Sequence, residues 1–258
     1  MKEETEKTSE QILLQIGAVC AILGSVIQVA AGTGFGNRTV GASAESVLRY
    51  IAARPDWYWP TVHLGFIFGA LLWVGALIAL AGSLTQGISW ALGRLGVAGI
   101  IVGATIHIVA SSINGFGLTA VAHAWAVAPA SEQASLLRAG DTLLWIEGGA
   151  WAGAISFFHG VPFILFGLAV ALSRRYPAWL GWVGAVGGSG SLVLGTMMFL
   201  GRPEMLYVAF AIVVSVWMVA MGVLMWRRAD AMGDVRWTVA AATQTIAIQG
   251  ATDVHGSH

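Results

Sequence analysis

The sequence predicts an all-α polytopic membrane protein, with six transmembrane helices in one bundle and short amphipathic helices in the outer loops. The 258 residues are 57% hydrophobic and 10% charged, with a mean hydropathy of +0.77, whereas soluble domains carry about 25% charged residues. Between Asp56 and Glu132 the only formally charged residue is Arg94. Apolar runs of about 20 residues, which is the length that crosses a bilayer, recur along the chain.

Six such runs define the predicted spans. They cover residues 11–31, 61–83, 91–114, 148–173, 178–200 and 205–226. The stretch 115–130 stays mildly apolar, so it could extend the third helix, re-enter the membrane or lie at the interface. We expect a polar segment at 1–10, a transmembrane domain at 11–228 and a weakly ordered polar tail at 229–258.

Arginine positions predict the orientation of the bundle. Arg94 borders the connection between spans two and three, Arg174 and Arg175 lie between spans four and five, and basic residues follow span six. The positive-inside rule then places both termini in the cytoplasm of a bacterial inner-membrane protein. Three arginines of the first outer loop argue against this orientation: Arg38, Arg49 and Arg54.

Each of the two longer outer loops, 32–60 and 115–147, contains an amphipathic pattern. In SAESVLRYIAARPDW, Ser43 is a suitable N-cap, and Val47, Leu48 and Ile51 share one face. In SEQASLLRAGDTLLWIE, Ser131 begins a second pattern that carries four leucines. We expect both segments to form short helices at the membrane interface.

Small residues recur at helical spacing within several spans. The third span has Gly96, Gly99 and Gly103, and the fifth has a similar series from Gly184 to Gly195. Such stripes favour close packing of helices in lipid. The stripe of the third span continues into polar residues at steps of four, four and three: His107, Ser111 and Asn114.

Four histidines lie in or beside the apolar runs, where ionisable residues usually face a protein interior or a functional site. His107 is 13 residues beyond Arg94, and His159 is 15 residues before Arg174. At about 1.5 Å per residue their depths agree within about 3 Å on neighbouring antiparallel spans. His63 is expected about two turns further out, and His123 falls in the outer loop. Pro162 should weaken the helix beside His159.

The first functional hypothesis is a cofactor site in the outer half of the membrane. His107 and His159 could ligate haem b, with His63 as a third ligand or proton relay. Alternatively, His63, His107, His159 and His123 could bind copper, zinc or non-haem iron. The role would be electron transfer or oxidation of a lipophilic substrate. Five further residues are predicted to line this pocket: Gln28, Ser111, Asn114, Trp151 and Ser156.

Two other hypotheses stay open. A non-redox enzyme could perform acid–base chemistry on a lipid or isoprenoid. Its proton-transfer groups would be Glu147, Asp141 and the histidines, and its pocket wall Trp145, Trp151, Phe157 and Phe158. Alternatively, the histidines only hold helices together in a transporter-like or assembly subunit. Glu147 borders the interface, where a partly solvated carboxylate is the simpler expectation.

Composition also limits the kinds of binding partner that we expect. The net charge of zero gives no indication of nucleic-acid binding, and the single cysteine, Cys20, excludes an internal disulfide. The expected partners are the lipid bilayer, a lipophilic small molecule and other membrane subunits.

The run FGLAVALSRRYPAWLGWVGAVGG, residues 166–188, resembles a segment of bacterial multi-pass inner-membrane proteins that are grouped as a domain of unknown function. In those proteins a helix ends in basic residues, and Pro-x-Trp-Leu-Gly-Trp begins the next helix. The resemblance implies a six- or seven-helix bundle and carries no catalytic residues.

Overall fold

The structure is a computed structural model that describes the backbone of residues 2–35, 43–201 and 207–255. Side chains are described for residues 9–34, 43–201 and 208–232. The described backbone is helical and contains no strand. Its elements are α1 (Lys2–Phe35), α2 (Ala44–Ala52), α3 (Tyr58–Ser83), α4 (Gly87–Ser112), η1 (Ile113–Leu118), α5 (Thr119–Val127), α6 (Ala130–Ala154), η2 (Ile155–Gly160), α7 (Val161–Leu172), α8 (Ala178–Phe199) and α9 (Tyr207–His255), where η marks a π-helical turn.

Six helical segments are long and apolar enough to cross a membrane, which confirms the predicted multi-pass architecture. They are Ser9–Gly34, Tyr58–Ser83, Gly87–Val127, Ala130–Leu172, Ala178–Phe199 and Val208–Met232. An α-helix makes its backbone hydrogen bonds internally and therefore suits a lipid environment. The protein is therefore an integral membrane protein whose surroundings are the lipid bilayer.

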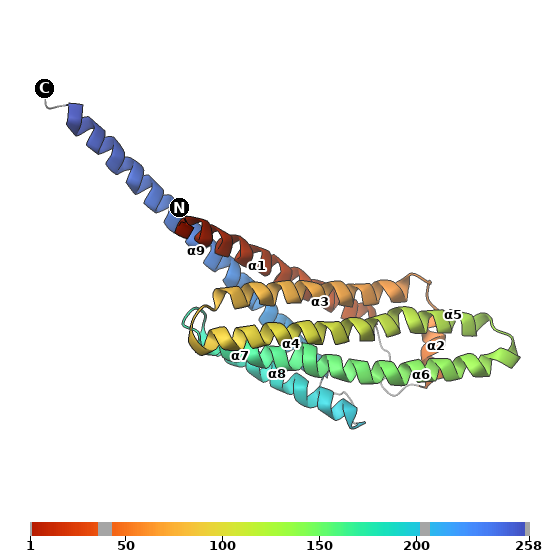
Figure 1. Cartoon of the computed structure of the whole chain (residues 1–258). Helices are drawn as coiled ribbons and strands as arrows, with labels where there is room; N and C mark the ends of the chain where they lie inside the picture. The colour runs from red at the N-terminus through yellow and green to blue at the C-terminus, as the bar shows by residue number, and fades with distance from the viewer. Residues whose placement is uncertain (1, 36–42, 202–206, 256–258) are drawn as a thin grey trace.

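The helices form one bundle (Figure 1). α1 packs on α3 and α9, α4 packs on α3 and α7, and α8 packs on α7 and α9. α2 lies against α5 and α6 at one end, which we call the cap end. The α3–α4 and α7–α8 connections lie at the opposite end, which we call the Arg175 end (Figure 1).

The third and fourth spans are longer than predicted, because each helix continues to the cap end. Helix runs without a break from Gly87 to Val127 and from Ala130 to Leu172. Residues 115–127 therefore extend the third helix. The prediction of a separate short helix beginning at Ser131 is wrong, since this segment is the first part of α6, which starts at Ala130. α5 and α6 pack on one another along this extension.

The other predicted amphipathic helix is confirmed as α2. The hydroxyl of Ser43 accepts a hydrogen bond from the Ser46 N–H at 3.3 Å and caps the helix. Val47, Leu48 and Ile51 are buried on one face. They pack with Trp59 and Leu118 in a small apolar cluster that joins α2 to the cap ends of the long helices.

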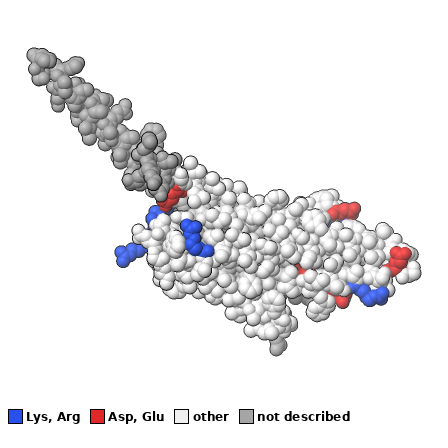
Figure 2. All heavy atoms as spheres, viewed as in Figure 1, with Lys and Arg blue, Asp and Glu red and all other residues white. Residues whose placement is uncertain are grey.

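Charged side chains gather at the two ends of the bundle, as Figure 2 shows for one face. The surface between them is almost entirely uncharged in this view and forms a broad band over the spans. Large apolar side chains such as Val102, Val186 and Val216 are more than half exposed on the helices. Exposed apolar side chains of this kind are stable against lipid and would be costly in water.

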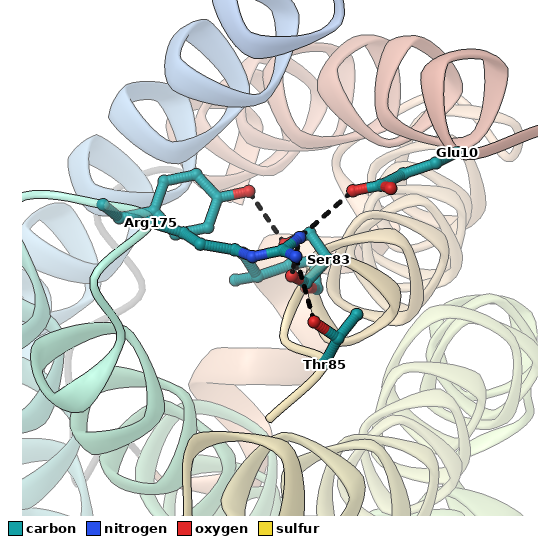
Figure 3. Close-up of polar contacts among 6 residues, drawn as sticks. Glu10, Ser83, Thr85 and Arg175 are labelled. Atoms are coloured by element: carbon teal, nitrogen blue, oxygen red, sulfur yellow. Dashed lines mark hydrogen bonds and ion pairs between the residues drawn. The ribbon is translucent and has the colours of Figure 1, made fainter. Parts of the chain in front are cut away.

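Arg175 joins three elements at its end of the bundle (Figure 3). Its guanidinium donates to the Ser83 carbonyl oxygen at 2.7 Å and to the Thr85 hydroxyl at 3.0 Å, and lies 3.2 Å from the Glu10 carboxylate. The Ser83 and Tyr176 hydroxyls are 2.9 Å apart. Burial raises the pKa of the Tyr176 phenol, so this hydroxyl stays protonated at neutral pH. These bonds connect α1, α3 and the α7–α8 connection.

α9 continues as a helix to His255. It therefore carries most of the segment 229–258, whose weak order stays a prediction. Side chains beyond residue 232 lie outside the described residues.

We predict that Gly103→Ala destabilises the protein by about 1–3 kcal/mol, which is the usual cost of overpacking. A Cβ at Gly103 would collide with the Phe157 carbonyl oxygen, which is backbone and cannot swing away. The measurement is thermal unfolding in detergent. Gly149→Ala is the matched control, because a Cβ there meets nothing within 4 Å. Equal melting temperatures for the two variants would contradict the prediction.

Candidate functional site: a buried histidine cluster

His107 and His159 meet in the interior of the bundle. His107 comes from α4 and His159 from the π-helical turn η2. Their ring centroids are 5.9 Å apart and their planes are inclined at 74°. Both side chains are buried, with relative exposures of 1% and 5%. This contact agrees with the equal depths that the sequence predicts for the two residues.

Aromatic rings enclose the pair. The Phe158 ring stacks on His107 with a centroid distance of 4.8 Å, and its centroid is also 4.8 Å from that of His159. Trp151 lies 5.3 Å from His107, and Phe66 meets the edge of His107 at 6.1 Å. Trp73 contacts His159 at 5.8 Å. The two imidazoles therefore lie in a buried environment rich in aromatic carbon.

Neither ring nitrogen of His107 has a hydrogen-bond partner among the described residues. A neutral imidazole carries one N–H donor and one lone-pair acceptor, so both functions are unsatisfied. Leaving a buried polar group unpaired costs about 1–3 kcal/mol. Buried polar groups without partners are rare in folded proteins, and each calls for an explanation such as a bound water or ion.

Two buried serine hydroxyls that are close to these histidines in the sequence also lack a hydrogen-bond partner among the described residues. Ser111 is one turn beyond His107, Ser156 is three residues before His159, and neither Oγ has a partner in the described part of the chain. Other helical serines behave differently, since the Ser112 and Ser191 hydroxyls each donate to the carbonyl four residues back. Ser111 and Ser156 are thus exceptions to the usual way of satisfying a helical hydroxyl in lipid.

His63 lies next to this pair and has a defined tautomer. Its Nδ1 is 2.9 Å from the Trp59 carbonyl oxygen, which can only accept, so Nδ1 carries the proton and Nε2 the lone pair. The Phe66 ring contacts both His63, at 5.9 Å, and His107. Gly115 makes room for His63, because a Cβ there would collide with the His63 side chain. We call His63, His107 and His159 the histidine cluster.

A chain of hydrogen bonds lies beside the cluster towards the cap end. The Trp59 indole N–H donates to Asn114 Oδ1 at 3.1 Å, and Asn114 Nδ2 donates to Glu147 Oε1 at 2.8 Å. Glu147 is only 6% exposed. The expectation of a partly solvated carboxylate at the interface is therefore wrong, because the carboxylate faces Asn114 of η1 inside the bundle.

Two π-helical turns flank the site on facing helices. η1 carries Asn114 and Gly115, and η2 carries Ser156, Phe158 and His159. In η2 the cause is local, since Pro162 has no N–H to donate and an undisturbed α-helix cannot continue through it. Single π-helical turns occur frequently at functional sites because they re-aim side chains.

Several predicted site residues lie elsewhere. His123 is in α5, with Nε2 at 3.4 Å from an Asp56 carboxylate oxygen, about two turns beyond Gly115. Gln28 donates to the Phe66 carbonyl oxygen at 3.2 Å and so supports the ring that touches both His63 and His107. Asp141 is exposed. Of the predicted pocket wall, Trp151 and Phe158 contact His107, whereas Trp145 and Phe157 are 78% and 44% exposed.

Among the residues whose side chains are described, no group of three or more His, Cys, Asp or Glu is arranged to hold a metal ion. The four histidines thus do not form a single ligand set. The ring contacts instead single out one pair, His107 and His159.

Sequence reasoning missed Trp59, Phe66 and Trp73. All three lie on α3, at steps of seven and seven, with His63 between the first two. This spacing places them on one helical face. The stripe of aromatic residues, which includes a histidine, is the sequence pattern that could have predicted their place in the site.

Comparisons with known protein families, with curated proteins and with solved structures find no match to this chain.

We predict that Asn114→Leu lowers the free energy of unfolding by about 2–4 kcal/mol, because it leaves the buried Glu147 carboxylate and the Trp59 N–H without this partner. The measurement is thermal unfolding in detergent. Thr142→Val is the control, since it removes one hydrogen bond from an exposed helix position. A loss for Asn114→Leu no larger than for the control would contradict the role of this chain.

Proposed function

We propose that the protein is a copper-binding membrane protein in which His107 and His159 ligate one Cu(I) ion. The proposal depends on His107, a buried imidazole whose two nitrogens have no partner among the described residues and whose ring contacts a second imidazole. Neutral imidazole is a good ligand for copper. An ion bonded to His107 would remove the cost of its unsatisfied lone pair.

The ring positions favour an ion over haem b. The ring centroids of His107, His159 and Phe158 form a triangle with sides of 5.9, 4.8 and 4.8 Å. The Phe158 centroid is thus equidistant from both histidines, about 3.8 Å from the midpoint between them. A haem held by both histidines would need free space between and around their rings, and the Phe158 ring, 4.8 Å from each histidine ring, already occupies that space. The residues present therefore do not fit a haem between these two ligands.

Charge favours a monovalent ion. No described carboxylate joins the two histidines in a metal-binding group, so the ligands contribute no negative charge. A divalent ion would leave two uncompensated charges in an apolar interior, where burial of charge is expensive. Cu(I) would leave only one uncompensated charge. The neighbouring Phe158 ring could stabilise that charge by a cation–π interaction.

The proposed role is electron transfer or oxidation of a lipophilic substrate. Copper held by His107 and His159 would supply this chemistry by cycling between Cu(II) and Cu(I), with one electron taken from a lipophilic donor and passed on to an external acceptor. The uncharged ligands would favour the reduced state and so make the oxidised state a strong oxidant. The proposed location is a bacterial inner membrane, and the arginine distribution favours an orientation with both termini in the cytoplasm. In that orientation the site lies in the outer half of the membrane.

The test is a titration of the purified protein with Cu(I) in competition with a chromogenic chelator. We predict one Cu(I) per wild-type chain and a loss of at least ten-fold in affinity for His107→Ala and for His159→Ala, because each removes a ligand. His123→Ala is the matched control, a histidine of the same chain outside the cluster, and should bind as the wild type does.

Binding below one tenth of an ion per wild-type chain would overturn the proposal, as would equal affinity in all four proteins. The absorption spectrum of the same wild-type sample adds a further check. A Soret band that sharpens on reduction would show that the protein binds haem and would overturn the copper assignment. That outcome would require Phe158 to move.

One observation favours a second candidate, which is acid–base chemistry on a lipid or isoprenoid. Glu147 is a buried carboxylate held by Asn114 close to Trp59, which in turn contacts His63. This candidate predicts that Glu147→Gln abolishes turnover while the wild-type protein binds negligible metal. Unchanged Cu(I) affinity in Glu147→Gln, with full wild-type occupancy, would favour the copper site.

A further inference from the structure

A cavity of about 590 Å³ opens at the Arg175 end of the bundle, far from the histidine cluster. Its lining comes from residues 84–89, which form the α3–α4 connection and the first residues of α4, and from residues 172–175, which form the end of α7 and the connection after it. Arg175 holds the walls in place through its bonds to Ser83 and Thr85 (Figure 3). The cavity is thus a fixed feature of the fold at the edge of the apolar spans.

Hydrogen-bond donors line one wall of this cavity. Gly87 has φ +57°, a conformation that favours glycine, and this turn starts α4 at the cavity. The preceding residue, Gln86, makes no side-chain cap, and the first N–H groups of α4 have no partner within the helix. A helix of 26 residues adds the positive end of its dipole there.

A positive charge without a counter-ion borders the same cavity. Arg174 is exposed and has no carboxylate partner among the described side chains, whereas Arg175 is paired with Glu10. Apolar side chains adjoin these polar groups, with Ile88 64% and Leu172 51% exposed. The cavity therefore offers a cation and backbone donors next to surfaces that lie against lipid chains.

We infer that this cavity binds the phosphodiester headgroup of an anionic phospholipid. The headgroup phosphate lies by Arg174 and the first turn of α4, and the acyl chains run along Ile88 and Leu172. Basic pockets between transmembrane helices bind anionic lipid headgroups by this combination of charge and shape. A free phosphate ion shares the headgroup chemistry but gains nothing from the apolar surfaces.

The test uses the purified full-length protein in detergent and native mass spectrometry, with phosphatidylglycerol or phosphatidylcholine added at equal concentration. We expect wild-type protein to retain phosphatidylglycerol in preference to phosphatidylcholine. Arg174→Gln should weaken phosphatidylglycerol retention by about five-fold, the effect of one arginine near a lipid surface. Arg174→Lys should keep most of it, because the charge remains.

Arg138→Gln is the matched control, since Arg138 is an exposed arginine of α6 near the cap end. Equal retention by wild type and Arg174→Gln would overturn the inference, as would an equal loss in Arg138→Gln. A third arm adds inorganic phosphate alone at millimolar concentration. Complete displacement of phosphatidylglycerol by phosphate would assign the site to a soluble anion and overturn the lipid assignment.

Discussion

The contact between Gly103 of α4 and the Phe157 carbonyl of η2 is the constraint on which the interior of this protein depends. In lipid, helices gain little from the hydrophobic effect between them, so they associate where small residues allow close packing. Here the absence of a Cβ at Gly103 brings two backbones together. His107, one turn further along α4, is thereby held in ring contact with Phe158 and His159. The stripe of small residues and the histidine pair are two parts of one helix interface.

Because the histidine cluster lies in a helix interface, the contacts that hold the helices together also position the side chains of the site. The π-helical turn η2 accommodates Pro162 and presents Phe158 and His159 to α4 at the same time. On the opposite helix, η1 presents Asn114 to Glu147 and leaves room for His63 at Gly115. Local irregularities of the backbone therefore provide the polar groups, while the regular helices on either side provide the packing. This division is typical of functional sites inside helical membrane proteins.

Much of this arrangement could be predicted from the sequence, because two simple physical rules govern it. Apolar run length determined the six spans, and counting at a constant rise per residue placed His107 and His159 at one depth. The burial of Glu147 could not be predicted in this way. It depends on α6 continuing towards the cap end and on Asn114 and Trp59, which approach from helices distant in sequence. The stretch 115–130 is equally apolar whether it is a helix or an interfacial loop, so only its packing against α6 decides.

The length of the third and fourth spans has a consequence for the outline of the bundle. Runs of 41 and 43 residues measure about 60 Å at 1.5 Å per residue, roughly twice the hydrocarbon thickness of a bilayer. At the cap end, α5 and the first half of α6 therefore form a helical head braced by α2, beyond the length that a single span needs. Such a head is rigid and makes the cap end of the bundle different in shape from the Arg175 end.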